Sequence, residues 1–215
     1  MLSNRTRLVI ADDHTLIANL CKQLLEPEYE VAGIVSDGRA LIRAADVLHP
    51  EVIIADIEMP ILNGLDAIEQ VKKLHPKIKA VILTMTSDTD VAAEAFRRGA
   101  SGYMLKTCAP SELVTCIREV LRGGRYLSPT LRNDDFACAR IMCRDTGERE
   151  KRLTSRQREV LQLLAEGKLM KEVGGILHMS TRTVAFHKYR IMEVLGARSS
   201  AELVRYAVRN HMVGA

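Results

Sequence analysis

The chain has 215 residues, which is enough for one large domain or for two domains of ordinary size. Its composition, 47% hydrophobic and 27% charged, is typical of a globular protein, and no apolar run reaches the roughly 18 residues of a membrane-spanning helix. Residues 1–148 carry 18 Lys and Arg against 21 Asp and Glu, whereas residues 149–215 carry 13 against 6. This basic C-terminal segment favours a nucleic-acid-binding module joined to a different kind of domain.

The cysteines and the N-terminal segment indicate the compartment. Five cysteines without a Cys-x-x-Cys pair argue against a disulfide framework or a zinc site. The first apolar stretch is too short, and becomes acidic too soon, for a secretory signal. We therefore expect a cytoplasmic protein with reduced thiols and no membrane partner.

The first 120 residues or so alternate short apolar runs with amphipathic runs, the pattern of βα units around a parallel sheet. Five strands are predicted at 7–11, 31–35, 52–56, 80–84 and 102–105. Five helices are predicted near 15–25, 38–48, 65–74, 89–98 and 111–122. These elements predict a three-layer α/β domain, in which ligands bind at the carboxyl ends of the strands.

The rest of the chain is divided into a connector and a helical segment. Residues 124–150 are charged and irregular in pattern, which predicts a linker. Four helices are then predicted at 155–166, 169–177, 181–195 and 200–210. Capping boxes at Thr154 and Ser199 and an N-cap at Ser180 mark three of their starts. Only three residues separate the second helix from the third, so we expect a helix-turn-helix.

Several polar residues fall at one edge of the predicted sheet. Asp12 and Asp13 follow the first strand, Asp56 ends the third, Thr84 ends the fourth and Lys106 follows the fifth. Converging carboxylates repel one another, and a hard divalent cation such as Mg²⁺ relieves this repulsion. An Asp carboxylate is also a nucleophile toward phosphorus, provided that positive charge neutralises the phosphoryl oxygens. The cluster thus predicts an Mg²⁺-dependent site of phosphoryl transfer.

Two other protein classes could place acidic residues at such an edge. A phosphatase of the haloacid-dehalogenase type needs Asp-x-Asp after the first strand, and here the two aspartates are adjacent. A flavodoxin-type flavin binder needs a Ser-, Thr- or Gly-rich phosphate loop there, and Asp12-Asp13-His14 would repel phosphate. Both classes are disfavoured.

Four segments carry a family resemblance: IADDH at 10–14, ADIEMPILNGLDAI at 55–68, VILTMTSD at 81–88 and GASGYMLK at 99–106. Together they resemble the receiver domain of two-component response regulators, a CheY-like (flavodoxin-like) fold with a five-stranded parallel sheet, over residues 5–123. The resemblance implies that Asp56 is the phosphoacceptor, and that Mg²⁺ is bound by Asp13, by Asp12 through water, by Asp56 and by the Glu58 backbone carbonyl. It also implies that Lys106 stabilises the phosphate, and that Thr84 and Tyr103 are the pair that moves on phosphorylation.

The predicted helix at 181–195 has two distinct faces. Val184, His187, Ile191 and Leu195 share one face and are expected to pack inward. The opposite face places large aromatic side chains beside arginines, which suits the reading of a DNA groove. Including flanking positions and expected phosphate contacts, the predicted DNA-binding residues are Lys171, Arg182, Thr183, Ala185, Phe186, Lys188, Tyr189, Arg190 and Arg198. An alternative is that Phe186 and Tyr189 pack on the receiver or on a partner subunit.

Residues 151–213 resemble the LuxR-type helix-turn-helix of the NarL/FixJ response regulators. The matching segments are LTSRQREVLQLLAEG at 153–167, KEV at 171–173 and STRTVAFHKYRIMEVLG at 180–196. Ala185, Phe186 and Tyr189 depart from residues common in that family, so operator preferences are not carried over. Gly174-Gly175 is a departure as well, because glycine is unfavourable inside a helix. The resemblance implies that the last helix pairs two subunits, with Leu203, Val204, Ala207 and Val208 as candidate contacts.

Together these features predict a transcription regulator that is phosphorylated by a cognate histidine kinase and that binds double-stranded DNA. We expect a homodimer in the phosphorylated or DNA-bound form, with phosphorylation relieving masking of the DNA-binding domain or promoting dimerisation. No enzymatic activity is expected beyond phosphoryl transfer and autodephosphorylation at Asp56. Two alternatives stay open at this stage: a regulator that acts independently of phosphorylation, and an adaptor that binds protein through its helical segment.

Overall fold

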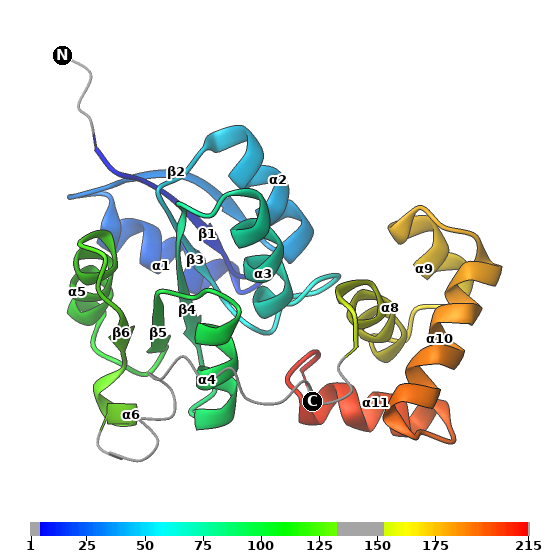
Figure 1. Cartoon of the computed structure of the whole chain (residues 1–215). Helices are drawn as coiled ribbons and strands as arrows, with labels where there is room; N and C mark the ends of the chain where they lie inside the picture. The colour runs from blue at the N-terminus through cyan, green and yellow to red at the C-terminus, as the bar shows by residue number, and fades with distance from the viewer. Residues whose placement is uncertain (1–4, 133–152, 215) are drawn as a thin grey trace.

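The computed structural model describes residues 5–132 and 153–214. The first range forms an α/β domain and the second forms a separate bundle of helices (Figure 1). Most of the predicted linker, residues 133–150, lies outside the described residues, and so do Cys138 and Cys143. Among the helices that the structure describes, none is long and apolar enough to cross a bilayer.

The α/β domain is built on a parallel sheet with the strand order β2-β1-β3-β4-β5-β6. The strands are β1 (Arg7–Ala11), β2 (Glu30–Val35), β3 (Val52–Ala55), β4 (Lys79–Thr84), β5 (Gly102–Leu105) and β6 (Tyr126–Leu127). The helices are α1 (Thr15–Leu25), α2 (Gly38–Leu48), α3 (Gly64–Leu74), α4 (Thr89–Arg97), α5 (Pro110–Leu121) and α6 (Pro129–Arg132). The five predicted strands and five predicted helices are confirmed to within a residue or two at their ends.

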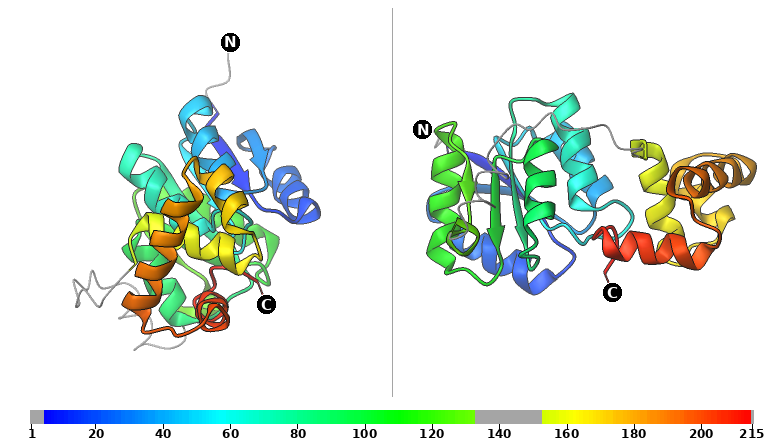
Figure 2. Two further views of the ribbon diagram at one scale, coloured as in Figure 1. Left: turned by 90° about the vertical axis from the view of Figure 1, so that its right-hand side faces the viewer. Right: turned by 60° about the horizontal axis from the view of Figure 1, so that its bottom comes forward.

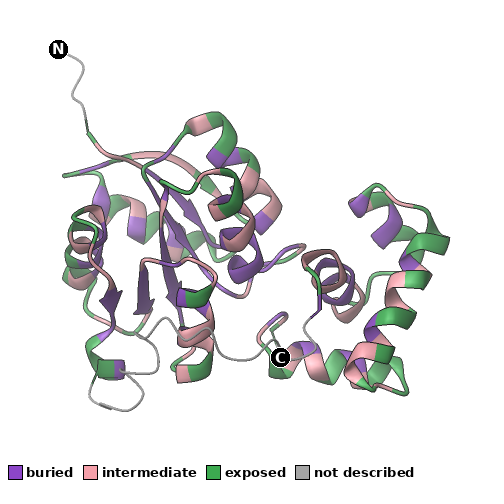
Figure 3. Cartoon of the chain, viewed as in Figure 1, coloured by how far each residue is buried: buried purple, intermediate pink, exposed green. Residues whose placement is uncertain are grey.

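Helices cover both faces of the sheet and create two apolar cores. Residues of α1 and α5 pack on one face, while α2, α3 and α4 pack on the other. Strands β3 and β4 are buried along nearly their whole length, as expected for the middle of a parallel sheet (Figure 3). Periodicity in the sequence identifies these elements because one stripe of each helix is buried and each central strand is apolar on both faces.

The sixth strand was not expected from the sequence. Tyr126 and Leu127 fall in the predicted linker, yet they pair in parallel with Gly102 and Tyr103 of β5, and both are buried. A two-residue strand has no readable alternation of its own. It forms because the backbone amides of Tyr126 and Ser128 donate to the Ser101 and Tyr103 carbonyls, which would otherwise lie on an open sheet edge.

The C-terminal domain consists of α8 (Ser155–Ala165), α9 (Met170–Leu177), α10 (Thr181–Leu195) and α11 (Ser200–Arg209) around one apolar core. The capping box at Thr154 and the N-cap at Ser180 are confirmed. Ser199 also caps its helix by accepting from the Glu202 amide, but the Glu202 carboxylate accepts from the Arg198 amide instead of closing a box. Val184 and Ile191 of α10 are fully buried as predicted, whereas His187 is half-buried.

The two glycines inside α9 have different structural reasons. A Cβ atom on Gly174 would lie 2.7 Å from the Met179 carbonyl oxygen in the turn that leads to α10. A Cβ atom on Gly175 would meet nothing within 4 Å, and Gly175 is exposed. Gly174 is therefore required by the close approach of the turn, while Gly175 only weakens the helix.

Alanine substitutions at these two positions should have opposite effects on stability. Gly175→Ala should raise the free energy of unfolding by about 0.5–1 kcal/mol, because alanine is the better helix former. Gly174→Ala should lower it by about 1–3 kcal/mol, because the added methyl group displaces the turn. Urea unfolding followed by circular dichroism measures both, and each variant serves as the other's control. Equal effects would contradict the close contact at Gly174.

Candidate functional site

The acidic residues meet at the carboxyl edge of the sheet. Ala11 and Ala55 are register partners in the adjacent strands β1 and β3, so the residues that follow them lie side by side. The Asp56 amide donates to the Ala11 carbonyl at 2.9 Å, and the Asp12 amide donates to Val35 at 3.0 Å. The Asp12 and Asp56 side chains are almost fully buried, while Asp13 is exposed at the rim.

Lys106 is inserted between the two buried carboxylates. Its Nζ lies 2.7 Å from Asp12 Oδ2 and 2.7 Å from Asp56 Oδ2. The backbone fixes this position, because Leu105 pairs with Thr84 across β5 and β4 and the Lys106 amide donates to the Thr84 carbonyl. One ammonium group therefore balances two carboxylates that would otherwise repel each other.

Burial and charge set the protonation of this pair. Burial raises the pKa of the Asp56 carboxyl, and although the hydrogen bond and charge of Lys106 act in the opposite direction, the net direction is upward. Burial alone would lower the pKa of Lys106, but its bonds to Asp12 and Asp56 outweigh that effect and raise it. The lysine is therefore charged, and the ionised form of Asp56 depends on the positive charge beside it.

The ligand atoms of Asp12, Asp13, His14 and Asp56 all lie within 4.8 Å of one another. Carboxylate oxygens at this spacing suit a hard divalent cation, so the donor set fits Mg²⁺. His14 was not predicted as part of the site, although it directly follows Asp13 in the sequence. Its Nδ1 lies 3.0 Å from Asp13 Oδ1.

The predicted switch residues lie between the site and α4. The Thr84 hydroxyl accepts from the Thr86 amide at 3.2 Å, and the Tyr103 hydroxyl donates to the Thr86 carbonyl at 2.7 Å. Tyr103 is fully buried, and burial raises the pKa of its phenol. Thr86 stands just before Asp88, the N-cap of α4, so both side chains contact the segment that leads into this helix.

The Glu58 side chain faces the C-terminal domain. Its Oε1 lies 3.5 Å from His211 Nδ1, just beyond the end of α11. A groove between the domains opens at the acidic edge, lined by Asp13 and His14 of the α/β domain and by Lys168 of the helical domain. The helical domain therefore approaches the candidate site itself, which the sequence did not indicate.

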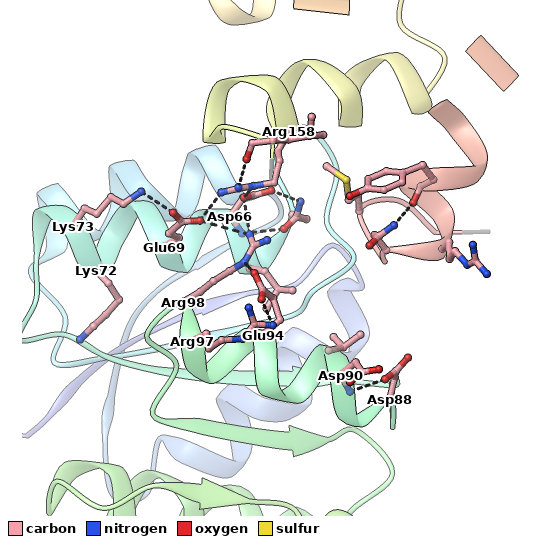
Figure 4. Close-up of a pocket in the computed structure, with 18 residues that line it drawn as sticks. Asp66, Glu69, Lys72, Lys73, Asp88, Asp90, Glu94, Arg97, Arg98 and Arg158 are labelled. Atoms are coloured by element: carbon pink, nitrogen blue, oxygen red, sulfur yellow. Dashed lines mark hydrogen bonds and ion pairs between the residues drawn. The ribbon is translucent and has the colours of Figure 1, made fainter. Parts of the chain in front are cut away.

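The two domains meet through polar side chains of α8 that the sequence did not single out. The buried Asp66 carboxylate of α3 accepts from Arg98 at the end of α4 and from Arg158 of α8 (Figure 4). Glu159 accepts from Gln70 of α3 at 3.0 Å, and it also pairs with Arg39 of α2. The polar residues spaced three and four apart on one face of α8 could have indicated this contact between the domains. In the sequence, however, they resemble an ordinary solvent-exposed helix face.

The predicted DNA-binding surface lies away from the α/β domain. Helix α10 lies on the side of the helical domain that is away from the α/β domain (Figures 1 and 2). Phe186 and Tyr189 are 60% and 70% exposed, so they do not pack on the receiver residues that the structure describes. Of the nine predicted contacts, Ala185 and Lys188 are half-buried, and the others are exposed: Lys171, Arg182, Thr183, Phe186, Tyr189, Arg190 and Arg198.

The four predicted dimerisation residues divide into two pairs. Leu203 and Ala207 belong to the apolar core of their own domain, with 2% and 0% exposure, so they are not available to a partner subunit. Val204 is exposed and Val208 is half-buried on the outer face of α11. The family resemblance had implied all four as candidates, and the packing of α11 on α8 separates the inner residues from the outer ones.

Comparisons with known proteins find a family match for each of the two domains. Residues 8–118 match the response regulator receiver domain, and residues 151–207 match the bacterial regulatory proteins of the luxR family. The chain is 32% identical over 214 residues to the oxygen regulatory protein NreC of Staphylococcus carnosus, covering 96% of this chain and 99% of that protein. It is 29% identical over 226 residues to the transcriptional regulatory protein DegU of Brevibacillus brevis, covering 98% and 96%.

Solved structures of RcsB match nearly the whole chain. The RcsB response regulator of Salmonella typhimurium matches with a TM-score of 0.64 and 26% identity, over 96% of this chain and 98% of that one. RcsB from Salmonella enterica serovar Typhimurium, bound to promoter rprA in the presence of phosphomimetic BeF3-, matches with a TM-score of 0.58 and 28% identity, over 94% and 98%. The chain therefore belongs to the two-component response regulators, a family of DNA-binding transcription regulators rather than classical enzymes, and joins a receiver domain to a LuxR-type helix-turn-helix.

Proposed function

We propose that a cognate histidine kinase phosphorylates Asp56 in the presence of Mg²⁺, in the cytoplasm, and that this controls transcription through α10. The observation that carries the proposal is the position of Lys106 Nζ, 2.7 Å from both Asp12 and Asp56 at the carboxyl edge of the sheet. An isolated buried carboxylate is costly, whereas one that a lysine and a cation keep ionised is ready to react.

The chemistry follows from these groups. An Asp56 oxygen attacks phosphorus in line with the phosphohistidine nitrogen, so that a P–O bond forms while the P–N bond breaks and the imidazole takes up a proton. Asp12, Asp13, Asp56 and the Glu58 carbonyl would hold Mg²⁺, which would supply positive charge for the phosphoryl oxygens. Lys106 contributes a second positive charge at the same edge, and the Thr84 hydroxyl can turn from Thr86 to donate to the phosphoryl group.

The phosphoryl group adds charge and hydrogen-bond acceptors beside Thr84 and Lys106. If Thr84 turns toward it, the Thr86 segment loses one partner while Tyr103 still holds its carbonyl. The start of α4 would then rearrange, and with it the surface formed by α4 and β5. These contacts favour a switch in which a change in the partner of the Thr84 hydroxyl alters the start of α4.

DNA binding by this protein is proposed to use the exposed face of α10. RcsB has been solved bound to DNA, and one of these structures contains two RcsB dimers on two parallel DNAs. By analogy we propose that this chain binds double-stranded DNA as a homodimer, with Val204 and Val208 of α11 as the contacts between subunits. Two copies of α10 would then read two half-sites of a two-fold-symmetric operator.

The phosphoacceptor is tested with a small phosphodonor, such as acetyl phosphate, and Mg²⁺. Asp56→Asn should reduce acyl-phosphate labelling to background, because the amide is not a nucleophile toward phosphorus. Asp46→Asn, a change at an exposed aspartate of α2, should leave labelling at the level of the parent. Intact-protein mass spectrometry counts the added phosphoryl groups. Full labelling of Asp56→Asn would place the site elsewhere.

The charge balance at the site predicts how Asp56 titrates. Lys106→Met should move the pKa of Asp56 further up, because the hydrogen bond and positive charge that lower it are lost. Asp12→Asn should move it down, because a neighbouring negative charge is removed. Without Mg²⁺, the Asp56 carboxyl should therefore ionise at a higher pH in Lys106→Met and at a lower pH in Asp12→Asn. Carbon NMR of the Asp56 carboxyl group measures the pKa directly, and shifts in the same direction in both variants would contradict this electrostatic account.

Salt dependence tests DNA binding. Lys188→Ala should weaken binding to all sequences alike and reduce the slope of log K against log salt concentration by about 1, because one phosphate contact is lost. Phe186→Ala should weaken the preferred sites more than random DNA, because it alters contacts with base edges. Lys77→Ala, on the receiver, is the control. Binding with little salt dependence would favour a protein-binding role for α10.

A further inference from the structure

The loop that links the phosphoacceptor to α3 is held from two sides. This loop, residues 56–63, begins at Asp56 and ends at Asn63, which caps α3 by accepting from the Asp66 amide at 2.9 Å. The receiver itself holds both ends, because the Gly64 amide donates to the Ile57 carbonyl at 2.9 Å and a Cβ atom on Gly64 would lie only 1.9 Å from the Asp56 carbonyl oxygen. The loop therefore has little freedom to move without moving the backbone of Asp56.

The middle of the loop is held by the other domain. Gln162 of α8 is completely buried, its Oε1 accepting from the Asn63 amide at 2.8 Å and its Nε2 donating to the Met59 carbonyl at 2.9 Å. Glu166, the C-cap residue that follows α8, accepts from the Ile61 amide at 3.0 Å and from Gln162 Nε2 at 2.9 Å. Two side chains of the helix-turn-helix domain thus bind three backbone groups of the phosphoacceptor loop.

The conformation that they hold is strained. Ile61 has a φ of +70°, a value that β-branched residues rarely adopt. Such a residue persists where its surroundings determine its conformation. Here the amide of Ile61 is bound by Glu166 and its side chain packs against the apolar core of the helical domain.

We propose that Gln162 and Glu166 are positioning residues of the phosphoacceptor site, so that docking of the helix-turn-helix domain and binding of the cation favour each other. They act through the loop that carries Glu58. With the loop held in this way, the candidate ligand atoms of Asp12, Asp13 and Asp56 already lie within 4.8 Å of one another. The coupling is reciprocal, so a bound cation also stabilises the docked domain. This inference rests on the proposed Mg²⁺ site.

The test measures Mg²⁺ affinity of the full chain by isothermal titration calorimetry. Gln162→Met keeps the side-chain size but loses both loop contacts, and it should weaken Mg²⁺ binding about fivefold. Gln70→Met is the matched control: it also removes a hydrogen bond between the domains, to Glu159, but does not touch the loop. It should leave the affinity within about twofold of the parent.

Glu166 provides a second pair of variants in case Gln162→Met does not fold. Glu166→Leu should weaken Mg²⁺ binding, while Glu166→Gln, which keeps an oxygen that can accept from Ile61, should restore most of it. Equal weakening by both would show that the charge of Glu166 acts directly on the cation, and would overturn its positioning role. Amide hydrogen exchange gives a readout apart from affinity: Gln162→Met should accelerate exchange at Asn63, and Mg²⁺ should slow exchange at Ile61 and Asn63 in the parent.

Two results would overturn the inference as a whole: an unchanged Mg²⁺ affinity in folded Gln162→Met, or an equal loss in Gln162→Met and Gln70→Met. Asp13→Asn distinguishes failure of the coupling from failure of the proposed Mg²⁺ site. It should abolish Mg²⁺ binding whether or not the loop is coupled to the other domain. If the parent chain binds no Mg²⁺, the proposed site and the inference fail together.

Discussion

One ammonium group between two buried carboxylates is the contact on which the functional part of this molecule depends. Asp12 and Asp56 are both only 5% exposed, and without Lys106 they would face each other in a medium of low dielectric. Four adjacent strands must be in register to assemble the contact, since β1 and β3 deliver the carboxylates, β5 delivers the lysine and β4 lies between β3 and β5. The order of the strands in the sheet therefore determines which side chains meet at the site.

The same loop that carries Glu58 serves two further purposes. It leads directly from Asp56 to the N-cap of α3, and it is the surface on which α8 docks. Polar groups dominate that docking surface, including the Asp66 carboxylate shared by Arg98 and Arg158. Interfaces of this polar kind within a chain are compatible with domain movement. Because Arg98 ends α4, a rearrangement of α4 would reach the docked domain through Asp66 as well as through the loop.

The docked face and the predicted DNA-binding face of the helix-turn-helix domain are different faces. Helix α8 faces the receiver, while α10 with Phe186 and Tyr189 faces away from it. In this structure Phe186 and Tyr189 of α10 are exposed, and both expectations drawn from the family, relief of masking and dimerisation, remain predictions. If phosphorylation promotes dimerisation, it would set how two copies of α10 are spaced along DNA.

The sequence by itself determined the local elements and the chemistry at their ends. Apolar runs and helix caps locate the strands and helices, and the rule that parallel strands end at one edge places Asp12, Asp56 and Lys106 together. The tertiary structure decided which side chains meet across long separations: Gln162 with Asn63, His211 with Glu58, and β6 with β5. It also decided that Leu203 faces inward and that Ile61 adopts a positive φ. The physical reason is that periodicity reports how one segment divides between core and solvent, whereas these contacts depend on where another segment, often some 100 residues away, is placed.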